Sequence, residues 1–206
     1  MNASTKQTSW VAFISAVLVS YALSGCASLT APADNVTVTK QSLPLIAPRT
    51  QFSASGRFSA KRDAQQASGQ FRYAQKGSDR TLEIFAPTGT PIARIEADAN
   101  SAKVTMASGE TRAAATLSEL LQGFIDIRVT DAQFSAWMQA VPLMDAKPER
   151  DAQGRIERFT ESAWMIEVGS RMEGNAGYVR RMRWAYAPEQ STEIRWVIDE
   201  FSDSVN

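Results

Sequence analysis

The sequence predicts a mainly β domain in which one curled antiparallel sheet encloses helices. Most of the chain after residue 50 alternates apolar and polar residues, short turns rich in Gly, Asn and Asp separate these segments, and two segments with helical spacing interrupt them near the middle. A single sheet of about seven or more twisted strands curls, and apolar helices inserted mid-chain fill its concave side.

The N-terminus has the pattern of a bacterial export signal. Residues 1–9 are polar with one positive charge, Lys6, and the run from Trp10 to Leu23 carries no charge. A transmembrane helix needs about 18 to 20 apolar residues, so this run is too short to span a bilayer and fits a cleaved signal better. We therefore predict a lipoprotein signal peptide over residues 1–25.

The only cysteine of the chain, Cys26, ends this segment in the sequence LSGC. This matches the bacterial lipobox, in which the thiol is alkylated by a diacylglyceryl group and small flanking residues let the peptidase cut before the cysteine. Two or more acyl chains then give stable anchoring. An ordinary secreted protein, or a short buried apolar segment with a structural thiol, is the alternative. Ala27 in place of aspartate favours the outer membrane.

The rest of the chain divides into a tether and one folded body. Residues 26–50 hold prolines and small polar residues without a helical stripe, which predicts a flexible tether behind the lipidated cysteine. The body then covers residues 51–206. Its period-two segments predict strands at residues 69–75, 81–85, 93–98, 163–168, 178–187 and 192–201, with turns at 76–79, 98–101, 107–110 and 151–155. In the segment 178–187, the alternation places Arg180, Met182, Trp184 and Tyr186 opposite Arg181 and Arg183.

Two helices are expected between the strands. Leu117, Leu120, Leu121 and Phe124 fall at helical spacing after Thr116, and Phe134, Trp137 and Met138 do so after a cap at Thr130 or Asp131. The aromatic and methionine side chains in the body suit either a filled core or a cavity for a lipid tail, and periodicity does not distinguish the two.

Composition removes many enzyme classes. The chain of 206 residues has 22 basic and 22 acidic residues, so no net field favours nucleic acid. Without histidine and with one cysteine, imidazole catalysis, Cys-His nucleophiles and thiolate zinc clusters are excluded. No nucleophile elbow, P-loop or dinucleotide fingerprint occurs. Carboxylate pairs remain open, and we expect no enzyme, cofactor or metal.

Several blocks in order carry a family resemblance: FSASGRFSAK and GQFRYAQ, then LEIFAPTGTPIARIEAD, LSELLQGFIDIRVTDAQFSAWMQAVP and RMRWAY followed by a Trp-bearing strand. From Gln51 to about Phe201 the chain resembles the LolB family of outer-membrane lipoprotein receptors. The resemblance implies an unclosed antiparallel β-barrel with helices covering an apolar cavity. A LolA-type periplasmic carrier would hand acylated lipoproteins to this receptor, which would insert them into the outer membrane without ATP or metal.

The resemblance also implies site residues. The family carries a Pro-Leu-Gly loop held to contact the membrane, and this chain has Pro87, Thr88 and Gly89 there, so Thr88 replaces the leucine. A simple hairpin turn is the alternative for this loop. Residues expected to line the acyl-chain cavity, each with core packing as its alternative role, are Phe58, Phe71, Tyr73, Leu82, Ile84, Phe134, Trp137, Met138, Met182, Trp184 and Trp196.

The expected protein is thus a lipid-anchored monomer on the outer membrane, facing the periplasm, with a carrier, acylated clients and membrane lipids as partners and no nucleic acid. A lipid-anchored envelope interaction or assembly protein with a solid β-core is the alternative. An envelope hydrolase using carboxylates or a serine is a further hypothesis, which a pair of carboxylates sharing a pocket would favour.

Overall fold

The computed structural model describes residues 47–125, 128–143, 146–174, 177–188 and 192–204. The predicted signal peptide, Cys26 and most of the predicted tether lie outside these residues. The strands are β1 Gln51–Arg62, β2 Gln65–Lys76, β3 Asp79–Phe85, β4 Pro91–Ala97, β5 Ala102–Met106, β6 Thr111–Ala114, β7 Lys147–Arg150, β8 Ile156–Glu161, β9 Trp164–Arg171, β10 Val179–Tyr186 and β11 Glu193–Ser202.

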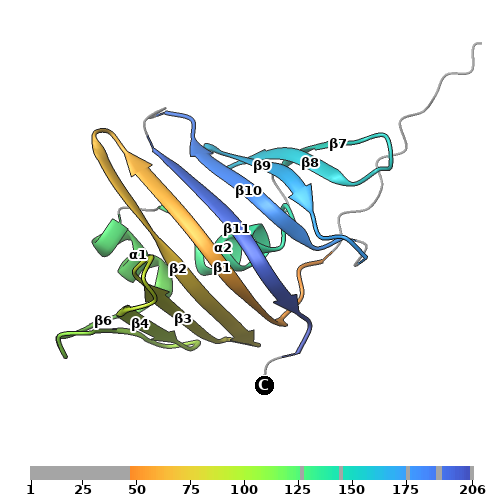
Figure 1. Cartoon of the computed structure of the whole chain (residues 1–206). Helices are drawn as coiled ribbons and strands as arrows, with labels where there is room; N and C mark the ends of the chain where they lie inside the picture. Colours follow the sequence, from red (N-terminus) through yellow and green to blue (C-terminus); the bar gives the residue numbers. More distant parts are fainter. Residues whose placement is uncertain (1–46, 126–127, 144–145, 175–176, 189–191, 205–206) are drawn as a thin grey trace, which may run out of the picture. The chain divides into compact units, whose positions relative to one another are not determined.

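All strands form one 11-stranded antiparallel sheet with the order β6-β5-β4-β3-β2-β1-β11-β10-β9-β8-β7. The first and last strands of the chain therefore pair at the centre of the sheet, from Ser53↔Ser202 to Lys61↔Glu193 (Figure 1). The middle of the chain supplies both ends of the strand order, β6 and β7, so the sheet stays open. The predicted unclosed antiparallel architecture is confirmed.

Both helices lie against the same face of the sheet, which we call the inner face (Figure 1). α1 spans Leu117–Ile125 and α2 spans Asp131–Met138, as the helical spacing predicted. Thr130 caps α2: its side chain accepts a hydrogen bond from the Gln133 backbone N–H, and the Gln133 side chain accepts one from the Thr130 N–H. This capping box satisfies two backbone donors that a helix start leaves unpaired.

The core lies between the inner face and the helices. Inward residues of the central strands are buried, among them Phe52, Phe71 and Ile198, while their neighbours along each strand face outward. Outward residues of the late strands form a row of ion pairs that links Glu149, Arg158, Glu167, Arg183 and Glu193 from strand to strand and ends on Arg195, which pairs with Glu193 along β11. The alternation thus separates an apolar layer from a charged one.

The alternation predicted for residues 178–187 is wrong at its beginning. The pairing of β10 with β9 shifts register between Val179 and Met182, so Val179 is buried whereas Arg180 and Arg181 are both exposed. A β-bulge inserts an extra residue on one strand and reverses the side-chain direction beyond it. Arg180 therefore avoids the buried face that strict alternation would have given it beside Met182.

Candidate functional site

An apolar cavity of about 240 Å³ lies on the inner face of strands β1–β5 and β11, against α1 and α2. Apart from Ser68, its lining side chains are all apolar. They are Phe58, Ala60, Ala67, Ser68, Phe71, Leu82, Ile84, Ile92, Ala93, Ile95, Val104, Met106, Leu121, Phe134, Ile194 and Trp196. Such a lining offers no group for catalysis and suits a hydrocarbon ligand.

Two cross-strand rows form the floor of this cavity. Ile84 pairs with Phe71 on one side and Ala93 on the other, and the row continues to Met106 on β5. The second row joins Leu82, Ile95 and Val104 in the same way. Because residues two apart on a strand point to the same face, period-two alternation in three consecutive strands is sufficient to build an apolar floor.

The structure brings part of the predicted cavity set together. Phe58, Phe71, Leu82, Ile84, Phe134 and Trp196 all line the cavity. Phe134 projects from α2 into an aromatic group, with its ring centroid 6.2 Å from that of Trp196 and 5.7 Å from that of Trp184, both edge-on. Their role toward acyl chains stays a prediction.

The remaining predicted residues, Tyr73, Trp137, Met138, Met182 and Trp184, lie in the core outside this lining. Trp137 and Trp184 have no exposed surface, and their ring centroids lie 5.6 Å apart with planes at 82°. Other aromatic rings occupy the space around them, since Trp137 also contacts Phe159 and Trp164. Trp137, Met138, Met182 and Trp184, on α2 and β10, pack in a filled part of the interior, which is the core-packing role that the sequence left open.

Tyr73 lies away from the cavity because its hydroxyl belongs to a polar cluster. The hydroxyl donates to Gln75 Oε1 at 2.9 Å, and Ser135 Oγ on α2 donates to the same oxygen at 2.5 Å. Burial raises the pKa of Tyr73 far above its ordinary value, against smaller opposing effects of Arg80 and Ser135. The neutral phenol therefore donates within β2 and orients the Gln75 amide, whose oxygen accepts the hydrogen bond from Ser135 that ties β2 to α2.

A buried carboxylate, Glu161, fixes the other side of α2. Its Oε2 accepts hydrogen bonds from Trp137 Nε1 at 3.1 Å and from the Leu143 backbone N–H at 2.9 Å, and its Oε1 accepts one from Gln133 Nε2 at 3.2 Å. Two of these three donors, Gln133 and Trp137, belong to α2, and the third follows the helix. The cavity wall that α2 supplies through Phe134 is therefore rigidly placed.

α1 is held by fewer polar contacts. The Ser118 backbone N–H donates to Asp131 Oδ1 at 2.8 Å, its hydroxyl donates to the Val129 carbonyl oxygen, and Asp131 lies 3.6 Å from Arg80. Leu121 is the α1 residue that reaches the cavity among the side chains described. Among the described residues, α1 is therefore held to the α2 segment by the two hydrogen bonds of Ser118 and to the sheet by its buried leucines.

The cavity opens beside the β1–β2 hairpin and the β3–β4 loop. Ala67 and Ser68 line it and are exposed, and Ile92 lines it with 40% of its surface exposed. Gly69 lies below them, where an added Cβ would sit 2.3 Å from the Phe85 carbonyl oxygen. Only glycine allows β3 to approach β2 so closely at this point.

The loop predicted to contact the membrane is an exposed tight turn. The Gly89 N–H donates to the Ala86 carbonyl at 2.8 Å, and Gly89 adopts φ of 87°, which favours glycine. Pro87 occupies the second position of the turn, where its fixed φ fits. The Thr88 hydroxyl lies 3.2 Å from that of Thr90 and the side chain is exposed. The turn therefore places Thr88 at its tip, and its role stays a prediction.

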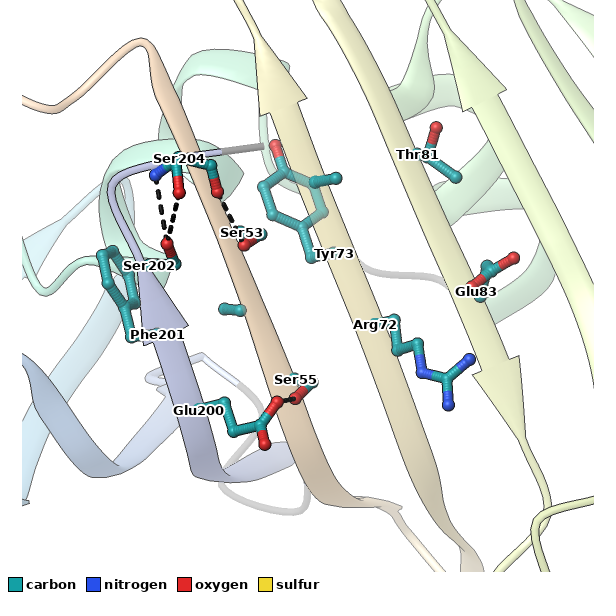
Figure 2. Close-up of a pocket in the computed structure, with 12 residues that line it drawn as sticks. Ser53, Ser55, Arg72, Tyr73, Thr81, Glu83, Glu200, Phe201, Ser202 and Ser204 are labelled. Carbon is teal, nitrogen blue, oxygen red and sulfur yellow. Dashed lines mark hydrogen bonds between the residues drawn. The ribbon is translucent and has the colours of Figure 1, made fainter. Parts of the chain in front are cut away.

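The outer face carries a polar hollow of about 550 Å³ over β11, β1, β2 and β3 (Figure 2). Glu200 and Glu83 both line it, so it tests the hydrolase hypothesis. Pairing places them in one row, Glu200↔Ser55↔Arg72↔Glu83, which puts their Cα atoms three strand spacings, about 14 Å, apart. Glycosidase carboxylates are about 5 to 9.5 Å apart. Glu200 accepts a hydrogen bond from Ser55, and Glu83 accepts one from Arg94. This hollow gives no catalytic pair.

Within the described residues, no group of three or more His, Cys, Asp or Glu side chains is arranged to hold a metal ion. None of the helices in the described ranges has the length and apolarity that a membrane span requires.

The residues that match known proteins coincide with the folded body. Residues 50–201 match the family described as Outer membrane lipoprotein LolB. A curated relative from Ralstonia nicotianae, "Outer-membrane lipoprotein LolB", is 30% identical over 150 residues, which cover 70% of this chain and 69% of the relative. The chain belongs to the LolB family. A LolB relative from Alkalilimnicola ehrlichii is 25% identical over 153 residues, covering 72% of this chain and 76% of the relative.

The fold agrees with this membership. The LolA superfamily protein NE2245 from Nitrosomonas europaea superposes with a TM-score of 0.51 at 10% identity, covering 79% of this chain and 89% of that structure. LolB membership and this fold support the receptor role in outer-membrane lipoprotein localization that the resemblance implied.

Sequence reasoning missed much of the cavity lining, namely Ala60, Ala67, Ser68, Ile92, Ala93, Ile95, Val104, Met106, Leu121 and Ile194. Alanine and serine give no apolar signal of their own. Ile95 had a usable signal, because it belongs to a predicted alternating strand and pairs with Leu82, and Val104 in turn pairs with Ile95.

Proposed function

We propose that the protein receives acylated lipoproteins from a LolA-type periplasmic carrier, holds their acyl chains in the apolar cavity and releases them into the outer membrane. The observation that carries the proposal is the cavity itself, whose lining is apolar except for Ser68 and opens beside exposed Ile92. A cavity of this lining stabilises hydrocarbon by about 0.8 kcal/mol for each methylene removed from water.

Uptake requires the cavity to enlarge. Its volume of about 240 Å³ lies below the roughly 300 to 1,000 Å³ of common ligand pockets. α2 is fixed by hydrogen bonds to Glu161 and Gln75, whereas the hydrogen bonds that tie the described part of α1 to the α2 segment come from Ser118, and its other anchors are buried leucines. We infer that α1 moves outward when acyl chains enter, and that burial of the chains offsets the lost contacts of α1.

Direction follows from relative affinities. Transfer without nucleotide runs downhill only if the receptor holds acyl chains better than the carrier does, and the membrane holds them better than both. In this proposal the protein is a monomer anchored through acylated Cys26, with residues 26–50 as the tether and the body facing the periplasm. The tip at Thr88 and the neighbouring Ile92 contact the bilayer as the client leaves. No reaction is catalysed and no cofactor is required.

The alternative, an anchored interaction protein, would have a solid core, and one half of this molecule is indeed solid. The test uses the acylated full chain in phospholipid vesicles and a carrier loaded with a fluorescent acylated client. We expect the client to reach the vesicles without nucleotide. If the client stays on the carrier, the interaction protein is the better account.

A matched pair of variants tests the cavity. Ala93→Leu fills the cavity from its floor, whereas Ala74→Leu makes the same change on the outer face, in the polar hollow. We expect Ala93→Leu to slow transfer at least about fivefold while the free energy of unfolding changes by less than about 1 kcal/mol, because the added atoms occupy free space. Ala74→Leu should transfer as the wild type does. Equal transfer by both variants would remove the cavity from the mechanism.

A further inference from the structure

One side of β2 is unpaired at the mouth of the cavity. β2 pairs with β1 along its whole length, Gln65–Lys76, but with β3 only from Gln70 onward. Of the strands in the described ranges, none pairs with that side of residues 65–69. Residues 65–68 are all exposed. We call residues 65–68 the free edge.

The hairpin geometry determines which backbone groups are available. Arg62 pairs with Gln65 across a turn of two residues, Asp63 and Ala64. The pair that closes such a turn exchanges both of its hydrogen bonds, and the direction of the backbone groups then alternates along the strand. Gln66 and Ser68 therefore direct their N–H and C=O groups away from β1, toward the open side.

This edge lacks the protection found at the ends of the sheet. β7, at one end, contains Pro148 and Lys147, and β6, at the other end, is short and carries Arg112. Proline, charge and shortness are the features by which edge strands avoid pairing with other chains. Residues 65–68 read QQAS, with neither charge nor proline. An edge without such protection is available to pair with an extended segment of another chain.

The free edge is continuous with the proposed acyl-chain site. Ala67 and Ser68 belong to both, so a molecule leaving the cavity by its mouth passes the edge. An acylated client places its acyl chains and its polypeptide on the same cysteine. With the acyl chains in the cavity, the residues that follow the cysteine lie beside Gln66 and Ser68.

We propose that the free edge binds the extended polypeptide segment directly after the acylated cysteine of a client, as an added antiparallel or parallel strand. Backbone hydrogen bonding of this kind does not depend on sequence, so one edge can serve clients of different sequence. The inference rests on the proposed function, because the acyl chains in the cavity bring the segment to the edge.

The first experiment uses the acylated full chain in phospholipid nanodiscs, with two readouts. The probe is a synthetic cysteine with two bromine-labelled palmitoyl chains, followed by a short peptide of Ser, Thr and Val. Bromine quenches tryptophan fluorescence on contact, and Trp196 lies in the cavity wall, so quenching reports filling of the cavity. Hydrogen exchange resolved to single amides reports the edge, at Gln66 and Ser68. Brominated palmitate without peptide is the control.

We expect both probes to quench tryptophan and the lipopeptide alone to slow exchange at Gln66 and Ser68, by about tenfold or more. Quenching by the lipopeptide without slower exchange would overturn the edge proposal and leave the proposed function standing. Absence of quenching by either probe would overturn both.

Variants at one position separate backbone from side chain. Gln66→Pro removes the free N–H, whereas Gln66→Ala keeps it and removes the side chain. We expect Gln66→Pro to weaken lipopeptide binding about tenfold and palmitate binding not at all, with Gln66→Ala equal to the wild type in both. N-methylation of the peptide should weaken binding to the wild type to the same degree. If the methylated and unmethylated lipopeptides bind equally, the edge does not pair with the client.

Discussion

The two halves of the sheet carry the same alternating pattern but differ in their interiors. In β7–β11 with α2, which we call the filled half, Phe159, Trp164 and Trp184 are at most 1% exposed and pack edge-on or tilted around Trp137. In β1–β6 with α1, which we call the hollow half, the floor includes Ala93 and half-buried Ile84, and a cavity of about 240 Å³ remains, bordered toward the filled half by Phe134, Ile194 and Trp196.

The helices account for this difference. α2 is buried on nearly every side, from Gln133 to Met138, and Glu161 and Gln75 satisfy its polar groups within the interior. α1 covers its half with Leu117, Leu120 and Leu121, of which Leu121 reaches the cavity. Alternation therefore decides which face is apolar, whereas the volume of the side chains that the helices insert decides whether that face encloses a solid core or a space.

The largest expected effect comes from the filled half. Trp184→Ala removes a fully buried ring with several aromatic neighbours and should lower the free energy of unfolding by about 3 to 5 kcal/mol. Ile84→Ala, in the hollow half, enlarges a space that already exists and should cost only about 1 kcal/mol. Urea unfolding of both variants measures the difference. Equal losses would mean that the hollow half is packed as tightly as the filled half.

Much of this architecture could be predicted from the sequence. Strands from Gly69 to Asp98 and from Trp164 onward, the turns between them and both helices follow from period, caps and turn residues, because these signals are local. The bulge before Met182 left no local signal, since it falls at two consecutive arginines, Arg180 and Arg181, and either could face outward. Strict alternation therefore placed Arg180 on the wrong face.

The candidate site was less predictable. The sequence correctly predicted that apolar side chains such as Phe71 and Ile84 face inward. Whether such a side chain lines the cavity or packs in the solid core depends on where α2 lies in three dimensions. Trp137 and Phe134 lie on the same helix and were predicted alike, yet the first is packed among rings and the second lines the cavity. Small residues such as Ala93 line the cavity because their side chains leave space. A single sequence does not indicate whether a neighbouring side chain fills that space.

A smaller effect is expected at the rim of the hollow half. Thr88→Leu adds apolar area at the exposed tip of the β3–β4 turn and should speed insertion of a client into vesicles by about two- to fivefold, since leucine gains up to about 1.5 to 3 kcal/mol when fully buried and only part of this at a tip. Thr88→Ser, which adds no apolar area, is the control. The measurement is the rate at which a fluorescent client enters vesicles. Identical rates for the leucine variant and the wild type would leave residues 86–90 as a hairpin turn alone.

The smallest expected effect lies on the outer face of the filled half. Burial disfavours ionisation of Glu193, but hydrogen bonds and charges from Arg183 and Arg195 outweigh it and place the pKa of this carboxyl below its ordinary value. A lowered pKa in the folded state adds stability above the unfolded value of about 4.3, and this stability is lost as pH falls through the folded value.

Glu193→Gln should therefore flatten the decline of the unfolding free energy below about pH 4.3, by less than about 1 kcal/mol because both arginines are partly exposed. Urea unfolding between about pH 3 and 7 measures this, with Glu157→Gln as the control for removing one carboxylate. A cavity in the hollow half is unaffected by this ion-pair row, so transfer of clients at neutral pH should be unchanged. If Glu193→Gln lowers transfer as well as changing stability in acid, the two halves are coupled. The filled and hollow halves would then differ in packing but not act separately in transfer.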